Sequence, residues 1–224
     1  MSLQHPPGTI CVASGDLSRY PAFFMSLAST QHPNGTTMQW HTGNGIAMNR
    51  NALIREMQGE WIWMIDDDHV WDGHLLMHLL DRNVDIVAPL YTMRYHPFTP
   101  SSFDEPLATG QYPAFSWETL SAHTGLFEVA ATGAAGLLIR KRVIKAMSDP
   151  WFEVGKVVSD QLWEDAWFCA KARKAGFRVY TDLDVQLGHI TQMTLWPAYK
   201  GVDIDIGANM RINMPHKYLV NGSS

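Results

Sequence analysis

The feature that most constrains this chain is an apolar run that ends in three consecutive acids. Residues 61–65 read Trp-Ile-Trp-Met-Ile, and Asp66, Asp67 and Asp68 follow directly. An unbroken apolar run of this length is typical of a strand that is covered on both faces in a parallel sheet. In open sheets of this kind, ligands bind beyond the carboxyl ends of the strands. The run therefore predicts an α/β fold with an acidic ligand site at one strand end.

Strand and helix patterns alternate along the rest of the chain, as expected for an α/β protein. Strands are predicted at 9–13, 36–41, 61–65, 85–88, 127–139 with an interruption at 133–136, 178–180 and 184–187. Helices are predicted at 21–29, 46–58, 72–80 and 140–147, with a further helix that Ser159 or Asp160 caps and that ends at Gly176. Residues 91–124 carry four prolines and are predicted to form a long irregular or hairpin-containing excursion.

The length of 224 residues, with 46% hydrophobic residues, predicts a single domain that spans 1–224. We expect a mixed, mostly parallel sheet flanked by helices. Within it, residues of about 9–90 are assigned to a nucleotide-binding half, about 91–190 to an acceptor-side half, and 191–224 to a tail or lid.

Charge and composition exclude several classes of function. The net charge is -5 and the longest basic run is the triplet 140–142, so a nucleic-acid groove is not expected. No apolar stretch approaches the roughly 20 residues that span a bilayer, and no secretory signal is visible. Cys11 and Cys169 lie in apolar stretches and are predicted to be reduced core thiols. These features predict a cytoplasmic protein with no transmembrane segment.

The three acids call for a compensating positive charge. Side chains alternate along a strand, so Asp66 and Asp68 are predicted to converge while Asp67 points to the other face. Two unit charges about 4 Å apart repel by roughly 4 kcal/mol at an effective dielectric constant near 20. Mg²⁺ or Mn²⁺ would offset this repulsion and would leave coordination positions for phosphate oxygens.

Two alternatives remain open at this point. The acids could form a solvated turn or cap the helix that begins near Asp72. A competing metal pair, Asp67 and His69, is predicted to share the opposite face of the strand.

Two further segments carry candidate groups, and both have a structural explanation as well. Glu164 and Asp165 lie in the predicted first turn of a helix, where the helix dipole favours acids whatever their function. His189 follows the predicted strand 184–187, and a single histidine there is more often structural than a ligand.

The order of these segments is informative when it is taken as a whole. It comprises the first strand and its loop, Asn49-Arg50-Asn51, the Asp-x-Asp end of 61–68, the glycine-containing stretch 131–139, Glu164 to Phe168, and Gly188-His189-Ile190. This order resembles the GT-A-fold glycosyltransferases, which transfer a sugar from a nucleotide-sugar donor, and the resemblance extends from about residue 10 to 190. It implies a single-domain, Rossmann-like GT-A fold.

The resemblance also implies roles for individual residues. It implies a Mn²⁺ or Mg²⁺ site formed by Asp66, Asp68 and His189. It implies donor contacts, with a UDP-sugar preferred over a GDP-sugar, from Asp16, Arg50, Asp66, Asp67 and Gly133. Asp165 matches the catalytic base of inverting members, with Glu164 beside it.

The implied reaction is metal-dependent sugar transfer to a hydroxyl of a glycan, lipid-linked or protein acceptor, with inversion preferred over retention. Trp196 is a candidate acceptor-stacking residue, and 191–201 a candidate lid. One alternative is a sugar-phosphate nucleotidylyltransferase, although residues 14–19 lack that family's glycine-rich basic loop. Another is a non-catalytic carbohydrate-binding protein on the same fold.

Overall fold

A computed structural model describes residues 5–15, 20–94, 97–156 and 161–191 of the chain. Several predictions therefore fall outside the described residues. These are the donor contact Asp16, the helix caps Ser159 and Asp160, and the part of the predicted tail or lid from residue 192 onward, including Trp196.

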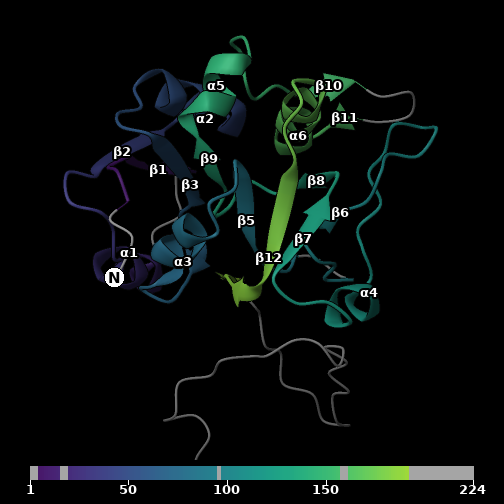
Figure 1. Ribbon diagram of the computed structural model, residues 1–224, viewed down its shortest axis with the longest axis horizontal. Helices are drawn as coiled ribbons and strands as arrows, with labels where there is room; N and C mark the ends of the chain where they lie inside the picture. Colours follow the sequence, from purple (N-terminus) through teal and green to yellow (C-terminus); the bar gives the residue numbers. More distant parts are fainter. Residues whose placement is uncertain (1–4, 16–19, 95–96, 157–160, 192–224) are drawn as a thin grey trace, which may run out of the picture. The chain divides into compact units, whose positions relative to one another are not determined.

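The centre of the fold is a seven-stranded sheet with the order β2-β1-β3-β9-β5-β12-β7 (Figure 1). The strands are β1 Thr9–Ser14, β2 Thr37–Thr42, β3 Trp61–Asp66, β5 Ile86–Leu90, β7 Leu126–Val129, β9 Leu138–Arg140 and β12 Val179–Gln186. β1 is parallel to β2 and β3, and β5 is parallel to β12. β9 is antiparallel to both β3 and β5, and β7 is antiparallel to β12. Only β9 and β7 oppose the common direction, so the predicted mixed, mostly parallel sheet is confirmed.

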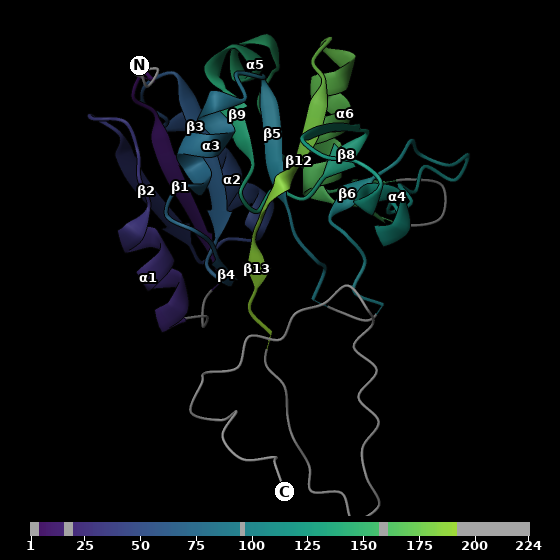
Figure 2. The ribbon, with the colours of Figure 1, turned by 60° about the horizontal axis from the view of Figure 1, so that its bottom comes forward.

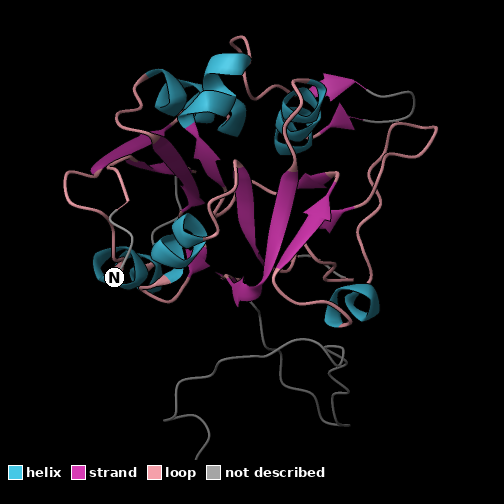
Figure 3. Cartoon of the chain, viewed as in Figure 1, coloured by secondary structure: helices cyan, strands magenta, loops and turns pink. Residues whose placement is uncertain are grey.

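Helices cover both faces of this sheet (Figure 3). They are α1 Pro21–Ser29, α2 Ile46–Arg55, α3 Leu75–Asp81, α4 Trp117–Ser121, α5 Lys141–Ala146 and α6 Glu164–Lys174. One buried apolar cluster contains side chains of α2, α5 and α6, and a second contains side chains of α1 and α3. The sheet is therefore the middle of three layers.

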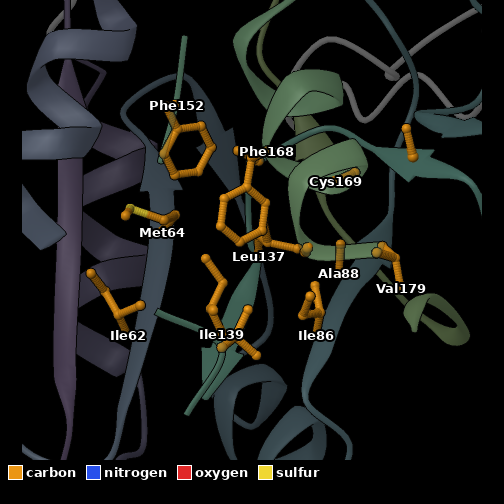
Figure 4. Close-up of a cluster of buried hydrophobic side chains, with 14 of the residues drawn as sticks. Ile62, Met64, Ile86, Ala88, Leu137, Ile139, Phe152, Phe168, Cys169 and Val179 are labelled. Atoms are coloured by element: carbon orange, nitrogen blue, oxygen red, sulfur yellow. The ribbon is translucent and has the colours of Figure 1, made fainter. Parts of the chain in front are cut away.

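Strand β3 shows why its sequence is apolar throughout. Ile62 and Met64 belong to the cluster on the α2, α5 and α6 side, whereas Trp63 and Ile65 belong to the cluster on the α1 and α3 side. Figure 4 shows Ile62 and Met64 within the first of these clusters, which also contains Phe168 of α6. Because both faces of the strand are covered by helices, every position from 61 to 65 is fully buried.

In the part of the chain that the structure describes, three short antiparallel ladders lie outside the main sheet. They are β4 His69–Val70 with β13 Gly188–His189, β6 Ser102–Phe103 with β8 Ala131–Thr132, and β10 Gly155–Lys156 with β11 Gln161–Leu162. In the β4–β13 ladder, His69 is the register partner of His189. Figure 2 shows β4 beside β13, so the ladder joins the segment directly after β3 to one near the end of the described residues.

The two late strands predicted at 178–180 and 184–187 are one strand, β12. Residues 181–183, which were expected to separate them, continue the strand, and Asp182 is fully buried in the sheet. Arg82 offsets its charge with hydrogen bonds of 2.6 and 3.0 Å to the two carboxylate oxygens. The pairing of β12 with β5 shifts register after Asp182.

Other element boundaries differ modestly from the predictions. α2 ends at Arg55 and α3 begins at Leu75, so each is shorter than expected. α6 begins at Glu164 with Trp163 as its N-cap, several residues beyond the predicted caps, and Trp163 makes no side-chain capping bond. Both cysteines are buried and free, as expected. No helix among the described residues is long and apolar enough to cross a bilayer.

Candidate active site

The predicted site residues that the structure describes lie near the edge of the sheet where β1 and β3 end. β3 ends at Asp66, beside Ala13 near the carboxyl end of β1. They form two groups of side chains. The first, called here the histidine cluster, consists of Asp68, His69 and His189. The second, called the arginine cluster, consists of Arg50, Asp66 and Glu164.

The histidine cluster depends on a turn directly after β3. The turn covers Asp67 and Asp68, and the chain then enters the β4–β13 ladder. Asp68 Oδ1 lies 2.9 Å from His69 Nδ1, and Asp68 Oδ2 lies 3.3 Å from His189 Nε2. The two imidazole rings stack with their centroids 4.2 Å apart. Three possible ligand atoms therefore lie within 4.8 Å of one another.

The hydrogen bonding of His189 shows which of its nitrogens is available. Nδ1 lies 2.9 Å from the backbone carbonyl oxygen of Thr92, and a carbonyl oxygen only accepts, so Nδ1 carries a proton. The other nitrogen, Nε2, is therefore the one that faces Asp68, with Oδ2 at 3.3 Å. A backbone carbonyl that accepts a hydrogen bond from one nitrogen is the usual support behind a histidine that binds a metal through the other.

His69 and Asp67 add to this fit. The Nε2 atom of His69 and the Oδ2 atom of Asp67 are buried without a hydrogen-bond partner in the described part of the chain. Burial raises the pKa of Asp67, and the neighbouring charges of Asp68 and Asp66 raise it further. Burial also disfavours the Asp68 carboxylate, but interactions with His189 and His69 outweigh it and hold the pKa of Asp68 well below its usual value. The residues present therefore fit a divalent metal ion.

The arrangement differs from the one that strand alternation predicts. Because β3 ends at Asp66, the alternation stops there, and the sequence neighbours Asp68 and His69 belong to one cluster. Asp66 instead makes a two-pronged contact with Arg50. The structure thus brings Asp68 and His189 together as expected, adds His69, and pairs Asp66 with a different residue.

Arg50 is the centre of the arginine cluster. Its Nη2 atom donates to both oxygens of Asp66 at 2.9 and 3.0 Å, and its Nη1 atom donates to Glu164 Oε1 at 2.5 Å. Its side chain is only 3% exposed. Burial disfavours the charged guanidinium, but Asp66 and Glu164 raise the pKa of Arg50 above its ordinary value. In this structure Arg50 therefore links β3 to the start of α6.

Asp165 lies next to the arginine cluster without an ion-pair partner among the described residues. Burial raises its pKa, the neighbouring charge of Glu164 adds to the effect, and the pKa of Asp165 is about 6. Its Oδ1 atom accepts a hydrogen bond of 2.8 Å from the backbone N–H of Ala166. A carboxylate with a pKa near neutrality is suited to general-base chemistry.

Gly133 lies between Asp165 and the buried Tyr91. A β-carbon at position 133 would lie 1.8 Å from Tyr91 Oη and 3.5 Å from Asp165 Oδ2. The space that a side chain would need is therefore occupied by the tyrosine hydroxyl. The Tyr91 ring also contacts His69 edge-on, with centroids 5.1 Å apart. Tyr91 thus packs between the histidine cluster and the predicted base.

Sequence reasoning missed Tyr91, Thr92 and Arg94, which lie in the segment after β5. Arg94 Nη1 lies 3.1 Å from Asp68 Oδ2. This segment begins at the carboxyl end of a central parallel strand, a location that marks ligand sites in open α/β sheets. The same rule that marks the end of β3 as a ligand site also marks the end of β5, and it is the sequence signal for all three residues.

Solved structures with the same arrangement of strands and helices share low sequence identity with this chain. GalNAc-T7, solved with UDP, GalNAc and Mn²⁺, has a TM-score of 0.55 at 10% identity, and the match covers 88% of this chain and 46% of that one. The A197 protein from STIV has a TM-score of 0.54 at 14% identity, covering 82% and 86%. TarS residues 1–349 of S. aureus, in complex with UDP-GlcNAc, has a TM-score of 0.50 at 12% identity, covering 84% and 60%. The fold is thus the GT-A fold of glycosyltransferases.

The family follows from the sequence itself. The model of glycosyl transferase family 2 matches residues 18–146, more than half of the chain, so this protein belongs to that family and is a glycosyltransferase. The match includes Arg50, Asp66 to His69, Arg94 and Gly133, whereas Asp165 and His189 lie beyond it. No curated protein matches the chain.

Proposed function

We propose that the protein transfers a sugar from a nucleotide diphosphate sugar to a hydroxyl acceptor, with inversion and with a divalent cation bound by Asp68, His69 and His189. The observation that carries this proposal is the orientation of His189. Its Nδ1 atom donates a hydrogen bond to the backbone carbonyl oxygen of Thr92, while its Nε2 atom faces Asp68. The UDP and Mn²⁺ in the GalNAc-T7 structure and the UDP-GlcNAc in the TarS structure favour a UDP-sugar as donor and Mn²⁺ as cation. A GDP-sugar and Mg²⁺ are the second choices.

The chain's own residues perform distinct tasks in this proposal. When bound, Mn²⁺ or Mg²⁺ supplies the positive charge that stabilises the leaving diphosphate. Asp68 contributes a carboxylate that is ionised at all working pH values, because its pKa is held far below neutrality. Thr92 orients the His189 ring, and the β4–β13 ladder holds His69 opposite His189.

Asp165 is the proposed general base. With a pKa of about 6, it is about 90% ionised at pH 7 and still basic enough to accept a proton. It takes the proton of the acceptor hydroxyl as the acceptor oxygen bonds to the anomeric carbon. The bond between that carbon and the diphosphate oxygen breaks in the same step, with its electron pair leaving on the phosphate. Attack from the face opposite the leaving group inverts the anomeric centre.

Glu164 and Arg50 support this base. The Arg50 hydrogen bond engages Glu164, which leaves Asp165 as the carboxylate without an ion pair in the described structure. We propose that the donor lies along the ends of β1 and β3, near Asp66 and Asp67, and that Asp16, which follows β1 in the sequence, also contacts it. Within one domain, residues of about 9–90 are proposed to form the nucleotide-binding half of the site, and residues of about 91–190 the acceptor-side half.

The acceptor hydroxyl approaches from the side of Asp165 in this proposal. Trp163 directly precedes α6, the helix that carries the proposed base Asp165. Trp163 is 52% exposed, which suits it to stack on an acceptor sugar ring.

Donor turnover tests the proposal. Wild-type protein is incubated with a panel of UDP- and GDP-sugars and simple sugar acceptors, with Mn²⁺ or with EDTA, and nucleoside diphosphate release is measured. We expect release from at least one donor, dependent on Mn²⁺ and lowered by about 100-fold or more in Asp68→Asn. NMR of the product reports the anomeric configuration. Glu118→Gln, at an exposed position on α4, is the matched control. Full Mn²⁺-dependent release by Asp68→Asn would contradict the proposal.

A further inference from the structure

Arg94 occupies the Asp68 oxygen that faces His189. Arg94 Nη1 lies 3.1 Å from Asp68 Oδ2, and the same oxygen lies 3.3 Å from His189 Nε2. The Asp68 side chain is 11% exposed, whereas that of Arg94 is 44% exposed. The guanidinium therefore approaches a nearly buried carboxylate from the solvent side. A cation held between Asp68 and His189 would share this oxygen with Arg94.

Arg94 and a metal ion would compete for the same carboxylate oxygen. The Arg94 guanidinium already contacts Asp68 Oδ2. A divalent ion on that oxygen beside an unmoved Arg94 would place two cations next to each other, and at such distances like charges repel strongly.

A nucleoside diphosphate resolves this conflict. Its phosphate oxygens carry at least two negative charges, and a guanidinium is suited to bind them with two parallel hydrogen bonds. Arg94 is also placed to move from one partner to the other. The backbone at its base is anchored by a 2.8 Å hydrogen bond from Met93 N–H to the Thr99 carbonyl, while the long side chain remains partly exposed.

We infer that Arg94 couples metal binding to diphosphate binding: it competes with the cation for Asp68 in the absence of nucleotide and binds the diphosphate in its presence. This inference rests on the proposed metal-dependent function. Arg94 is a positioning residue in this scheme. It lies two positions after Thr92, whose carbonyl oxygen orients the His189 ring, so one short segment after β5 contacts both His189 and Asp68. Because coupling between two ligands is reciprocal, Arg94 also makes tight nucleotide binding depend on the metal.

The coupling is measured by isothermal titration calorimetry on the full chain. Mn²⁺ is titrated into protein without nucleotide and into protein saturated with UDP, and the ratio of the two dissociation constants is the coupling factor. The variants are Arg94→Ala and Arg94→Lys. Arg178→Ala is the matched control, because Arg178 is an exposed arginine that contacts Glu128 at 3.7 Å, away from the cluster.

We expect Arg94→Ala to bind Mn²⁺ alone about threefold to fivefold more tightly than wild type, since a partly exposed competing ion pair has been removed. Its coupling factor should fall by about tenfold, because the contact to the diphosphate is lost as well. Arg94→Lys, which keeps the charge without the planar fork, should bind Mn²⁺ alone as wild type does and lose part of the coupling. Arg178→Ala should match wild type throughout.

Two outcomes would overturn the inference while leaving the proposed function intact. These are a wild-type protein whose Mn²⁺ affinity does not change with UDP, and an Arg94→Ala variant with unchanged Mn²⁺ affinity and coupling. A wild-type protein that binds no Mn²⁺ even with UDP would instead overturn the proposed metal site, and the inference with it.

Discussion

Arg50 donates a 2.5 Å hydrogen bond to Glu164 from a position 114 residues earlier in the chain, and this bond decides which of two adjacent acids is compensated. Glu164 is engaged by the guanidinium, whereas Asp165 retains a buried carboxylate with a pKa of about 6. A buried carboxyl group whose pKa is raised toward neutrality is a candidate acid or base. The predictions below follow from this and related contacts.

Arg50→Ala should destabilise the protein by about 3 kcal/mol, because it leaves two acids of a buried ion cluster without their cation. Urea unfolding followed by tryptophan fluorescence measures the change. Arg50→Lys, which keeps the charge but not the two-pronged contact, should give a smaller loss. If Arg50→Ala instead unfolds like wild type and loses only UDP binding, Arg50 is a nucleotide contact as the family resemblance implies.

The pH profile of kcat/KM should have an acidic limb near pH 6. The base works only when ionised, and burial has moved the pKa of Asp165 upward from 3.8 to about 6. Activity should therefore fall by about tenfold per pH unit below that point and reach a plateau above it. Asp165→Asn should lower kcat by about 100-fold to 10,000-fold with UDP binding retained. A profile that is flat from pH 5 to 7 would exclude this carboxylate as the base.

His69→Ala should weaken Mn²⁺ binding by about tenfold or more, measured by calorimetry in the presence of UDP. Its Nε2 atom is buried without a hydrogen-bond partner in the described structure, which is costly unless a ligand binds there. His74→Ala, at an exposed position before α3, is the control. Asp66→Asn provides the contrast, because Asp66 is bound to Arg50 and should affect Mn²⁺ by less than about threefold. A large effect of Asp66→Asn with none from His69→Ala would restore the Asp66 and Asp68 pair expected from strand alternation.

Gly133→Ala should cost about 1–3 kcal/mol of stability, since the new β-carbon would lie 1.8 Å from Tyr91 Oη. The double variant with Tyr91→Phe removes that oxygen and should recover part of the loss. A double-mutant cycle by urea unfolding isolates this coupling. Additive effects of the two substitutions would show that the hydroxyl is not what occupies the space above Gly133.

Local signals predicted the layers of the fold well. The apolar run at 61–65 predicted a doubly covered strand, and β3 alternates between the two apolar clusters as a strand of that kind should. The helix at Pro21–Ser29 has the predicted bounds. By contrast, a break between strands was predicted at 181–183, because no local signal shows that Arg82, about 100 residues earlier, offsets the charge of Asp182.

The sequence by itself determined the class of fold and the residue types available at the end of β3, because side-chain periodicity and the acid run are local properties. Only the tertiary structure decided how these residues are grouped. The strand ends at Asp66, the β4–β13 ladder sets His69 opposite His189, and Arg50 engages Asp66 and Glu164. These pairings join residues up to about 120 positions apart, and their geometry depends on strand register and on the burial of charge. No short stretch of sequence carries that information.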